Sequence, residues 1–252
     1  MARDTKVTAT RTRISAAAII VMLGLGASSA SANDNPLVGL WPINEGSGQT
    51  VRDWSGKANG GVLGASSAAD AGDPSWIALP SSRYYKRNAL RFGGDDYVTV
   101  RDSASLEPEK ISVGAVVRAA TSPGAYRYVV SKGALQCSTA SYGLYTGANG
   151  GLRFYVSNGT DFVLSADAGT TLWDGDWHVV LGTFDGGLVR LFVDGREVGT
   201  GTPTSITLAY GFPTNDNFHI GDYRGSCADP LGFVGDIDAV AVANRAYDWS
   251  GS

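Results

Sequence analysis

Short runs of alternating apolar and polar residues follow one another along most of the chain and predict β-strands. Glycine, Asp, Asn and Pro, which favour turns, separate these runs, and the sequence holds 34 glycines. No long helical pattern is visible beyond the first thirty or so residues. The pattern predicts an all-β protein with strands at LVGLWPI, ALRF, YVTV, ISVGAVVRA, RYVVSK, YGLYTG, GLRFYVS, DFVLSA, WHVVLGTF, LVRLFVDG, NFHIGDY and GDIDAVAVANRA.

Three local features refine this strand prediction. Asp194 and Gly195 follow an alternating run, and because both residues tolerate positive φ they predict a tight hairpin. Pro42 has no backbone N–H to donate, so the first strand should lie at an edge or end there. Residues 65–87 are rich in Ser, Ala and Pro and predict a long surface excursion between strands.

The N-terminus has the pattern of an export signal. Basic residues precede an apolar run over residues 14–27, and Ala30-Ser31-Ala32 offers a small-residue cleavage site. The run is shorter than the roughly 20 residues that span a membrane, and no later stretch approaches that length. We therefore predict a signal peptide at 1–32, a secreted mature chain and no membrane span.

Charge and length bear on the expected partners and on the number of domains. The formal net charge is −4, so nucleic acid is not an expected partner. No Pro-rich or Ser-rich linker divides residues 33–252, and all-β sandwiches often use this length for one domain. We expect one domain and a monomer.

The chain contains two cysteines, Cys137 and Cys227. In an oxidising compartment an even pair of thiols is expected to form a disulfide. The alternative is two separate buried thiols. A zinc site is a weaker interpretation, because the two Cys and two distant His residues show no ligand spacing.

Four motifs in succession resemble the LamG-like jelly-roll family, within the concanavalin A-like lectin/glucanase group. They are LVGLWPINEGSGQTVRDWSGKANGGVLG at 37–64, ALRFGGDDYVTV at 89–100, DGDWHVVLGTFDGGLVRLFVDGREVG at 174–199 and GFVGDIDAVAVANRAY at 232–247. The resemblance implies a two-sheet antiparallel jelly-roll sandwich. Such domains serve most often as carbohydrate-binding or adhesion modules, sometimes with a bound Ca²⁺.

Some details of the motifs bear on that resemblance. The placing of Cys137 and Cys227 resembles secreted members with one disulfide. Ala239 stands where members commonly carry an acid after the second Asp of the last motif. The sequence ends shortly after that motif, so we expect a stand-alone protein without a catalytic domain on the same polypeptide.

Asp236 and Asp238 share one strand face at i, i+2 spacing, and three interpretations compete. In a catalytic interpretation, the two acids are the paired carboxylates that a glycosidase needs. In a structural interpretation, which we favour, Asp238 accepts hydrogen bonds from backbone amides of the first strand and the NEGSG turn. In a metal interpretation, Asp236 or Asp238 joins the Asn44-Glu45 region and Asp53 around a structural Ca²⁺, which takes six to eight oxygens.

Aromatic residues divide into an expected core set and an expected ligand set. Those in the family motifs should pack between or beside the sheets: Trp41, Trp54, Trp177, Phe184 and Phe192. A disulfide would draw two loops together into a shallow ligand site rimmed by Tyr126, Tyr142, Asp222, Tyr223 and Arg224.

The sequence favours a secreted, non-catalytic module that binds an extracellular glycan or another surface ligand. His178 has no nearby Ser or Cys nucleophile, and the chain has no G-x-S-x-G, H-E-x-x-H or P-loop motif. Two alternatives remain open. One is a polysaccharide hydrolase or lyase of the same sandwich group, and the other is a protein-binding adhesive or structural surface protein.

Overall fold

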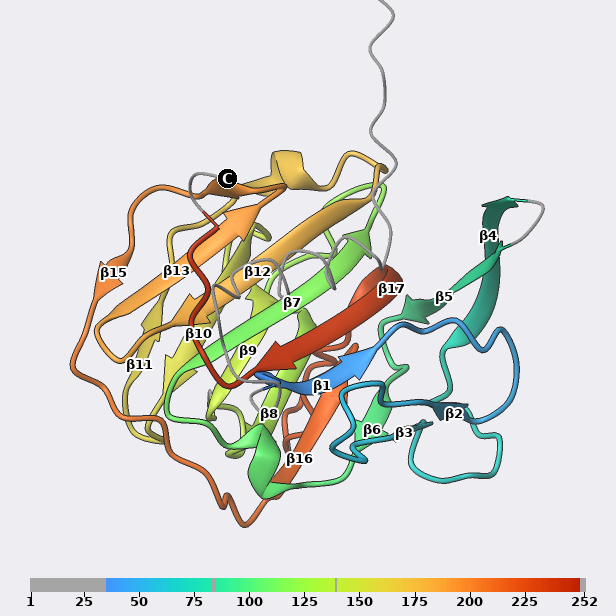
Figure 1. Cartoon of the computed structure of the whole chain (residues 1–252), viewed down its shortest axis with the longest axis horizontal. Coiled ribbons are helices and arrows are strands. Elements are labelled where there is room, and N and C mark those ends of the chain that lie inside the picture. Colours follow the sequence, from blue (N-terminus) through green and yellow to red (C-terminus); the bar gives the residue numbers. More distant parts are fainter. Residues whose placement is uncertain (1–34, 83–84, 139, 250–252) are drawn as a thin grey trace, which may run out of the picture.

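Two antiparallel β-sheets are packed face to face in the computed structural model, which describes residues 35–82, 85–138 and 140–249 (Figure 1). The predicted signal peptide at 1–32 lies outside these residues. Helical structure in the described part is limited to two 3₁₀ turns, η1 (Ala104–Leu106) and η2 (Thr170–Leu172), and none of its helices is long and apolar enough to cross a membrane. The predicted all-β sandwich is confirmed.

Sheet A has the order β14-β13-β12-β7-β17-β5-β4, with β1 beside β17 and β15 beside β13. Its strands are β1 (Leu37–Trp41), β4 (Ser75–Ser82), β5 (Tyr85–Gly93), β7 (Ile111–Arg118), β12 (His178–Phe184), β13 (Leu188–Val193), β14 (Arg196–Glu197), β15 (Thr202–Pro203) and β17 (Val234–Ala243).

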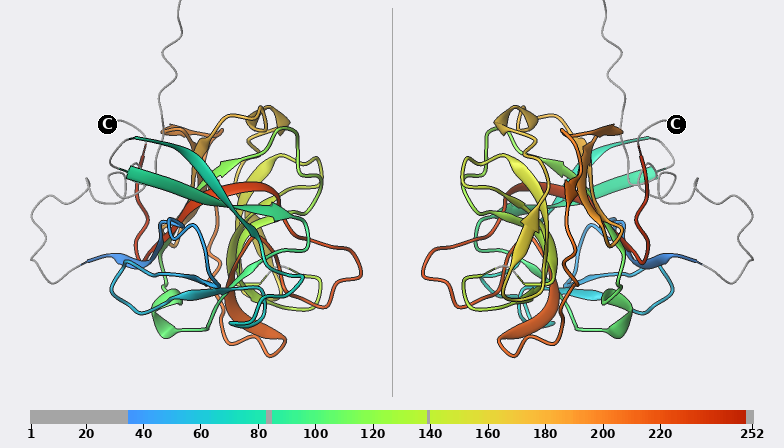
Figure 2. Two further views of the ribbon diagram at one scale, coloured as in Figure 1. Left: turned by 90° about the vertical axis from the view of Figure 1, so that its right-hand side faces the viewer. Right: turned by 90° about the vertical axis from the view of Figure 1, so that its left-hand side faces the viewer.

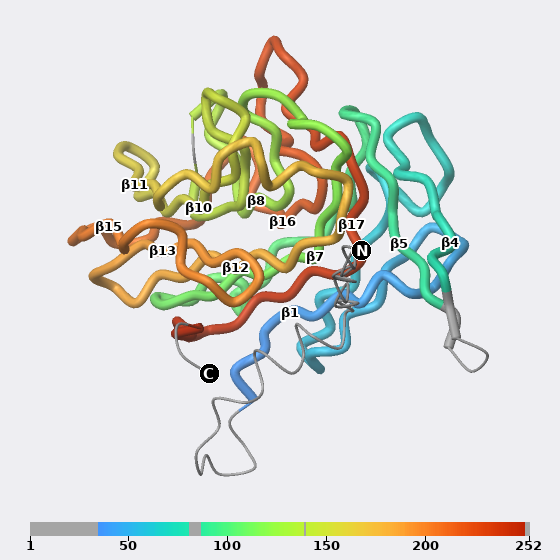
Figure 3. The backbone as a smooth tube through the Cα atoms, turned by 90° about the horizontal axis from the view of Figure 1, so that it is seen from above, coloured from blue at the N-terminus to red at the C-terminus, as the bar shows by residue number. Residues whose placement is uncertain are grey.

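Sheet B has the order β11-β10-β9-β8-β16-β6-β3-β2. Its strands are β2 (Thr50–Val51), β3 (Gly61–Leu63), β6 (Val98–Val100), β8 (Tyr128–Ala134), β9 (Tyr142–Thr146), β10 (Leu152–Ser157), β11 (Phe162–Leu164) and β16 (Asn215–Ile220). Seen from above, β8, β10 and β16 lie in one layer and β7, β12 and β13 in the other (Figure 3).

The main core lies between the two sheets, because alternate residues of each strand point inward. Trp41 of β1 is fully buried and stacks on Phe218 of β16, with ring centroids 5.1 Å apart. At Gly182 of β12 a side chain would not fit, since a Cβ atom there would lie 2.2 Å from the ring of Phe154. Glycine at this position therefore allows the close packing of the two sheets.

The first and last strands lie side by side, as the sequence predicted. β1 pairs with β17, with Leu40 opposite Ala241 and Trp41 opposite Val240. β17 also pairs with β7 and β5, so it ties the N-terminal segment into the middle of sheet A. β1 ends at Trp41, directly before Pro42, which agrees with the missing amide donor of proline.

The predicted hairpin between β13 and β14 is confirmed. Asp194 and Gly195 form its turn with φ values of 48° and 80°, the left-handed conformation that this residue pair tolerates. Asp194 also accepts a hydrogen bond from the backbone N–H of Val179 at 2.9 Å. The turn is thereby joined to the start of β12.

His178 links the same turn to Asp174 and makes stability depend on pH. Its ring nitrogens lie 2.7 Å from Asp194 and 3.1 Å from Asp174, and the hydrogen bond to Asp194 raises the pKa of His178 to about 9. A raised histidine pKa stabilises the fold fully below the unfolded value of about 6.5, and this contribution is lost as pH rises to about 9. We expect His178→Gln to lower the free energy of unfolding most below pH 6.5.

Urea unfolding of the wild type and of His178→Gln across pH 6 to 10 measures how the stability difference changes with pH. His219 is a built-in control, because burial lowers its pKa to about 3 and it stays neutral over that range. A stability difference that is the same at pH 6 and pH 10 would contradict a charged His178.

Residues 65–87 were predicted to be one long excursion, and this prediction is wrong for their second half. β4 and β5 form an antiparallel pair that projects beside the sandwich (Figures 1 and 2). Trp76 of β4 donates its indole N–H to the carbonyl of Gly48 at 2.9 Å. The Ser- and Pro-rich composition hid this strand, because its stability comes from pairing with β5 rather than from its own residue preferences.

Candidate ligand-binding site

The loop of residues 222–232, which connects β16 to β17, begins and ends at adjacent points. Gly221 has a φ of 90°, and a Cβ atom there would lie 2.2 Å from the ring of Phe92, so the position requires glycine. Phe233 donates its N–H to the carbonyl of Gly221 at 2.7 Å. The loop therefore leaves and re-enters the sandwich at one place, like an Ω-loop.

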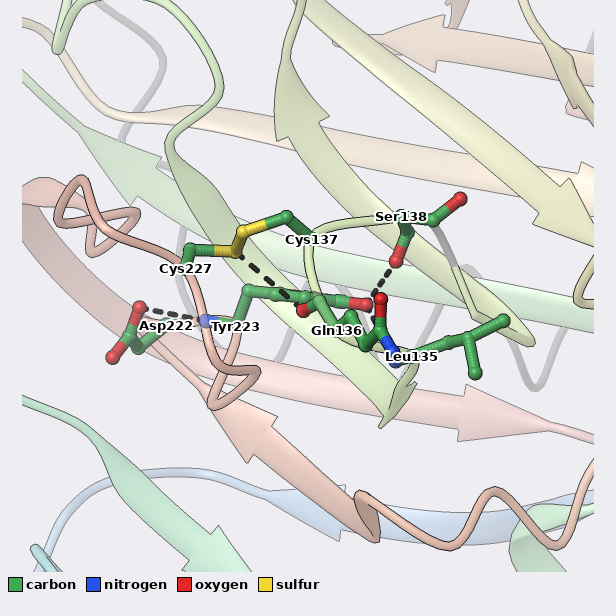
Figure 4. The surroundings of a disulfide bond; sticks show 7 residues. All are labelled: Leu135, Gln136, Cys137, Ser138, Asp222, Tyr223 and Cys227. Atoms are coloured by element: carbon green, nitrogen blue, oxygen red, sulfur yellow. Dashed lines mark hydrogen bonds between the residues drawn. A yellow bond between two sulfur atoms is a disulfide. The ribbon is translucent and has the colours of Figure 1, made fainter.

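Tyr223 holds this loop against the outer face of sheet B. Its ring is 2% exposed and lies 4.7 Å from the ring of Tyr128, centroid to centroid. Its hydroxyl accepts a hydrogen bond from the N–H of Leu135 at 2.8 Å and donates one to the carbonyl of Ser138 (Figure 4). The tyrosine thus binds the loop to the segment that follows β8.

A disulfide between Cys137 and Cys227 joins the same two segments, with 5.1 Å between the Cα atoms (Figure 4). The predicted bridge is confirmed. Two further bonds hold the far side of the loop: Arg127 donates to the carbonyl of Pro230 at 2.6 Å, and Tyr128 N–H donates to the carbonyl of Leu231 at 2.8 Å. Both ends and the middle of the loop are therefore attached to sheet B.

A pocket of about 330 Å³ lies between this loop and the turn before β6. Its volume falls at the lower end of the range of small-molecule sites, ~300–1,000 Å³. The lining is mainly polar and consists of Gly94, Asp95, Asp222, Tyr223, Arg224, Gly225, Cys227, Ala228, Asp229, Pro230 and Leu231. We call this the loop pocket.

Asp222 and Arg224 give the loop pocket its charge pattern. The Arg224 guanidinium lies 3.1 Å from an Asp222 carboxylate oxygen and 4.0 Å from the ring centroid of Tyr97. Burial, with a contribution from the charge of Asp95, raises the pKa of Asp222 against the opposing hydrogen bonds from Tyr223 N–H and Arg224. The pocket therefore offers hydrogen-bond donors and acceptors in fixed positions.

The five residues predicted to rim a ligand site are not all at the loop pocket. Asp222, Tyr223 and Arg224 line it. Tyr142 is fully buried in the core, where its hydroxyl donates to the carbonyl of Leu106 at 2.9 Å. Tyr126 is 50% exposed just before β8 and does not line the pocket.

Sequence reasoning missed the contribution of the segment before β6. Asp95 lines the loop pocket and the ring of Tyr97 lies under Arg224. Both residues belong to the motif ALRFGGDDYVTV, which reads as a turn and a strand start. The two adjacent acids of that turn, Asp95 and Asp96, were the signal in the sequence that could have placed this segment at a polar site.

Asp236 and Asp238 each bind arginine side chains. Asp236 accepts from Arg91 Nε at 2.8 Å and from Arg118 at 2.5 Å, and Asp238 pairs with Arg87. Burial by itself would raise the pKa of Asp236, but the two arginines outweigh it and hold the pKa below its ordinary value. Burial raises the pKa of Asp238 despite the charge of Arg87.

These ion pairs correct the structural interpretation of the two acids. The acids bind β17 to β5 and β7, whereas the sequence placed Asp238 on backbone amides of the first strand. Asp53 has that role instead, accepting from Leu40 N–H at 3.0 Å and from Asn59 N–H at 2.8 Å.

The residues predicted to hold Ca²⁺ do not fit the ion. Asp53 is bonded to backbone amides, and Asp236 and Asp238 are neutralised by arginines. Glu45 accepts a hydrogen bond from Arg52 N–H at 2.9 Å. Each predicted ligand therefore has protein partners of its own, and no three of the four predicted ligands, all of them described residues, lie within 4.8 Å of one another.

An acidic cluster does occur elsewhere among the described residues, formed by Asp102, Glu107 and Asp216. The fully buried ammonium of Lys132 lies 2.9, 3.4 and 3.1 Å from carboxylate oxygens of these three acids, respectively. It also donates to the carbonyl of Asp216 at 2.6 Å. The protein's own cation therefore occupies the position that a metal ion would take, and the cluster does not fit an additional one.

A larger hollow of about 500 Å³ lies over the outer face of sheet A. Its charged groups, Arg91, Arg118 and Asp236, bind one another, and Arg118 also lies 4.6 Å from the ring centroid of Trp177. Its charged groups are thus engaged with one another, and the loop pocket is the better candidate site.

Comparison with known proteins identifies a family and a set of related folds. A family model described as the concanavalin A-like lectin/glucanases superfamily matches residues 92–250, well over half of the chain. No curated protein matches the sequence.

Two solved structures illustrate the related folds. Domain 4 of an extracellular GH43 arabinanase from Geobacillus stearothermophilus, in complex with arabinotriose, has 15% identity and a TM-score of 0.59, covering 84% of this chain and 94% of that domain. Trypanosoma rangeli sialidase in complex with sialic acid has 15% identity and a TM-score of 0.56, covering 88% of this chain but 32% of the sialidase. At these identities the likeness shows a shared fold.

Proposed function

The chain belongs to the concanavalin A-like lectin/glucanase superfamily, and from this premise we propose that it is a secreted, non-catalytic carbohydrate-binding protein whose glycan ligand occupies the loop pocket. One observation carries the proposal. The disulfide-anchored loop holds a carboxylate and a guanidinium together at the wall of a polar pocket.

The chemistry of the pocket suits sugar hydroxyl groups. A hydroxyl is both a donor and an acceptor, and Asp222 and Arg224 supply the matching acceptor and donor at 3.1 Å from each other. Hydrogen bonds to charged groups contribute ~1.5–3 kcal/mol each. Because several bonds hold the loop, little conformational entropy would be lost when a ligand binds.

Two further observations support this function and the secreted location. The arabinanase domain of the same fold was solved with arabinotriose. A disulfide persists in oxidising compartments, which agrees with the export signal read from the sequence.

We expect Arg224→Ala to weaken glycan binding at least tenfold, because it removes a charged donor from the pocket. Screening the purified protein against an oligosaccharide panel that includes arabinotriose and sialyllactose would select a ligand, and calorimetry would measure the two affinities. Arg101→Ala, at an exposed arginine that does not line the loop pocket, is the matched control and should bind like the wild type.

The same incubations separate binding from catalysis. New reducing ends or unsaturated products would show an enzyme and defeat the non-catalytic proposal. Equal affinities of the wild type and Arg224→Ala would show that the glycan does not bind in the loop pocket.

A further inference from the structure

Trp54 lies at the surface, although its place in a family motif predicted a core position. Its side chain is 54% exposed. The structure describes all six tryptophans, and the other five are buried or half-buried. An exposed indole ring does not contribute the stabilising free energy that burial of its large apolar surface would give. A surface tryptophan in a hollow is therefore a candidate contact for a ligand.

The ring lines a hollow of about 410 Å³ beside the β1–β2 connection. The other lining residues are all polar: Asn44, Glu45, Ser47, Thr50 and Arg52. None of them lines the loop pocket. We call this hollow the Trp54 pocket.

Glu45 gives the Trp54 pocket an acceptor that the protein leaves partly unused. One carboxylate oxygen accepts from Arg52 N–H at 2.9 Å, whereas the other is shielded from solvent and has no hydrogen-bond partner. A ligand cannot reach this buried oxygen, so a ligand hydroxyl would donate to the oxygen that Arg52 N–H contacts, which can accept a second hydrogen bond. Because Glu45 and Arg52 carry opposite charges, the pocket as a whole favours an uncharged ligand.

The backbone around the Trp54 pocket is fixed from several sides. The carbonyl of Asn44 accepts from the Asn88 side chain of β5 at 3.0 Å. Ile43 has a φ of 48°, a strained conformation for a β-branched residue, which persists only where surrounding contacts impose it. On the other wall, Trp54 N–H donates to the carbonyl of Leu40 at 2.7 Å.

We propose that the Trp54 pocket is a second saccharide site, which takes a neutral pyranose ring of a glycan. The ring stacks its apolar face on the indole of Trp54, Glu45 accepts from a ring hydroxyl, and Arg52 donates to another. The ligand class rests on the proposed function, but the site does not depend on the loop pocket.

The test uses the full mature protein and an array of neutral pyranose oligosaccharides, namely the pentaoses of cellulose, xylan, mannan and galactan. We expect Trp54→Ala to weaken binding of the best of these about tenfold, and Trp54→Phe to recover most of the loss because it restores an aromatic face. Phe162→Ala removes another exposed ring, 49% exposed and outside the Trp54 pocket, and should leave affinity unchanged.

Acrylamide quenching of tryptophan fluorescence gives an independent readout. Trp54 is the most exposed tryptophan, so the bound saccharide should reduce quenching of the wild type and not of Trp54→Ala. No saccharide-dependent protection, or equal affinities of wild type and Trp54→Ala, would overturn the second site.

The experiments distinguish failure of the loop-pocket proposal from failure of the Trp54-pocket proposal. Loss of binding in Arg224→Ala with normal binding in Trp54→Ala would remove the second site and leave the loop pocket. The reverse pattern would remove the loop pocket and leave the Trp54 pocket.

Discussion

Replacing Lys132 by Met should lower the free energy of unfolding by about 3 kcal/mol, near the lower end of the ~3–5 kcal/mol that breaking a buried ion pair costs. The lysine is fully buried in β8 and places one positive charge among the carboxyl groups of Asp102, Glu107 and Asp216. Methionine fills a similar volume but leaves the three acids facing one another. Their side chains are 45%, 26% and 16% exposed, respectively, so water screens part of the repulsion.

The loss should depend on pH in a predictable direction. Burial already raises the pKa of Glu107, and the charge of Lys132 opposes that rise. Without the ammonium the pKa should rise further, and a carboxyl with a raised folded pKa destabilises the fold above that pKa. The Lys132→Met defect should therefore shrink as pH falls from 7 towards 4.

Urea unfolding of wild type and variant at these pH values measures both effects. Lys110→Met changes an exposed lysine and should cost little. Calcium added to Lys132→Met at pH 7 should restore part of the stability, because the three acids then lack their cation. A defect that neither pH nor calcium changes would show that the lysine acts through packing and not through charge.

The sandwich was predictable from the sequence because its signals are local and repeated. Alternating apolar positions define the strands, and Asp194-Gly195 defines a turn through backbone conformation alone. The pairing of β1 with β17 was implied by the structural interpretation of Asp238, which placed the last strand beside the first, although the contacts named for Asp238 were wrong. The strand β4 was missed because its pairing with β5 is a tertiary contact that composition does not show.

The candidate sites were harder to predict, because they depend on which side chains meet. Alternation places Tyr142 in a strand but does not say which of the two faces it occupies, and it is buried in the core. Asp236 was predicted only to share a strand face with Asp238, and its arginine partners come from two strands more than a hundred residues away in the sequence. Trp54 lies in a motif whose register suggested burial, and only the packed β1–β2 connection shows it exposed.

Removing the disulfide with Cys137→Ala and Cys227→Ala should lower the free energy of unfolding by about 4 kcal/mol. The bridge closes a loop across a sequence separation of 90 residues, and the chain-entropy model gives about 4 to 5 kcal/mol for that length. The folded loop keeps its other contacts, including the Tyr223 hydroxyl bonds and the Arg127 bond to Pro230. Most of the loss should therefore arise from the freer unfolded chain.

Urea unfolding of the double variant, compared with wild type in reducing and oxidising buffer, measures this loss. Reduced wild type should match the double variant, because both lack the same cross-link. If the bridge also orders the loop pocket, glycan affinity there should fall in the double variant. Binding at the Trp54 pocket, which neither cysteine lines, should stay unchanged. A stability change well below 2 kcal/mol would instead mean that the unfolded chain already holds the two segments close together, and the entropic account would fail.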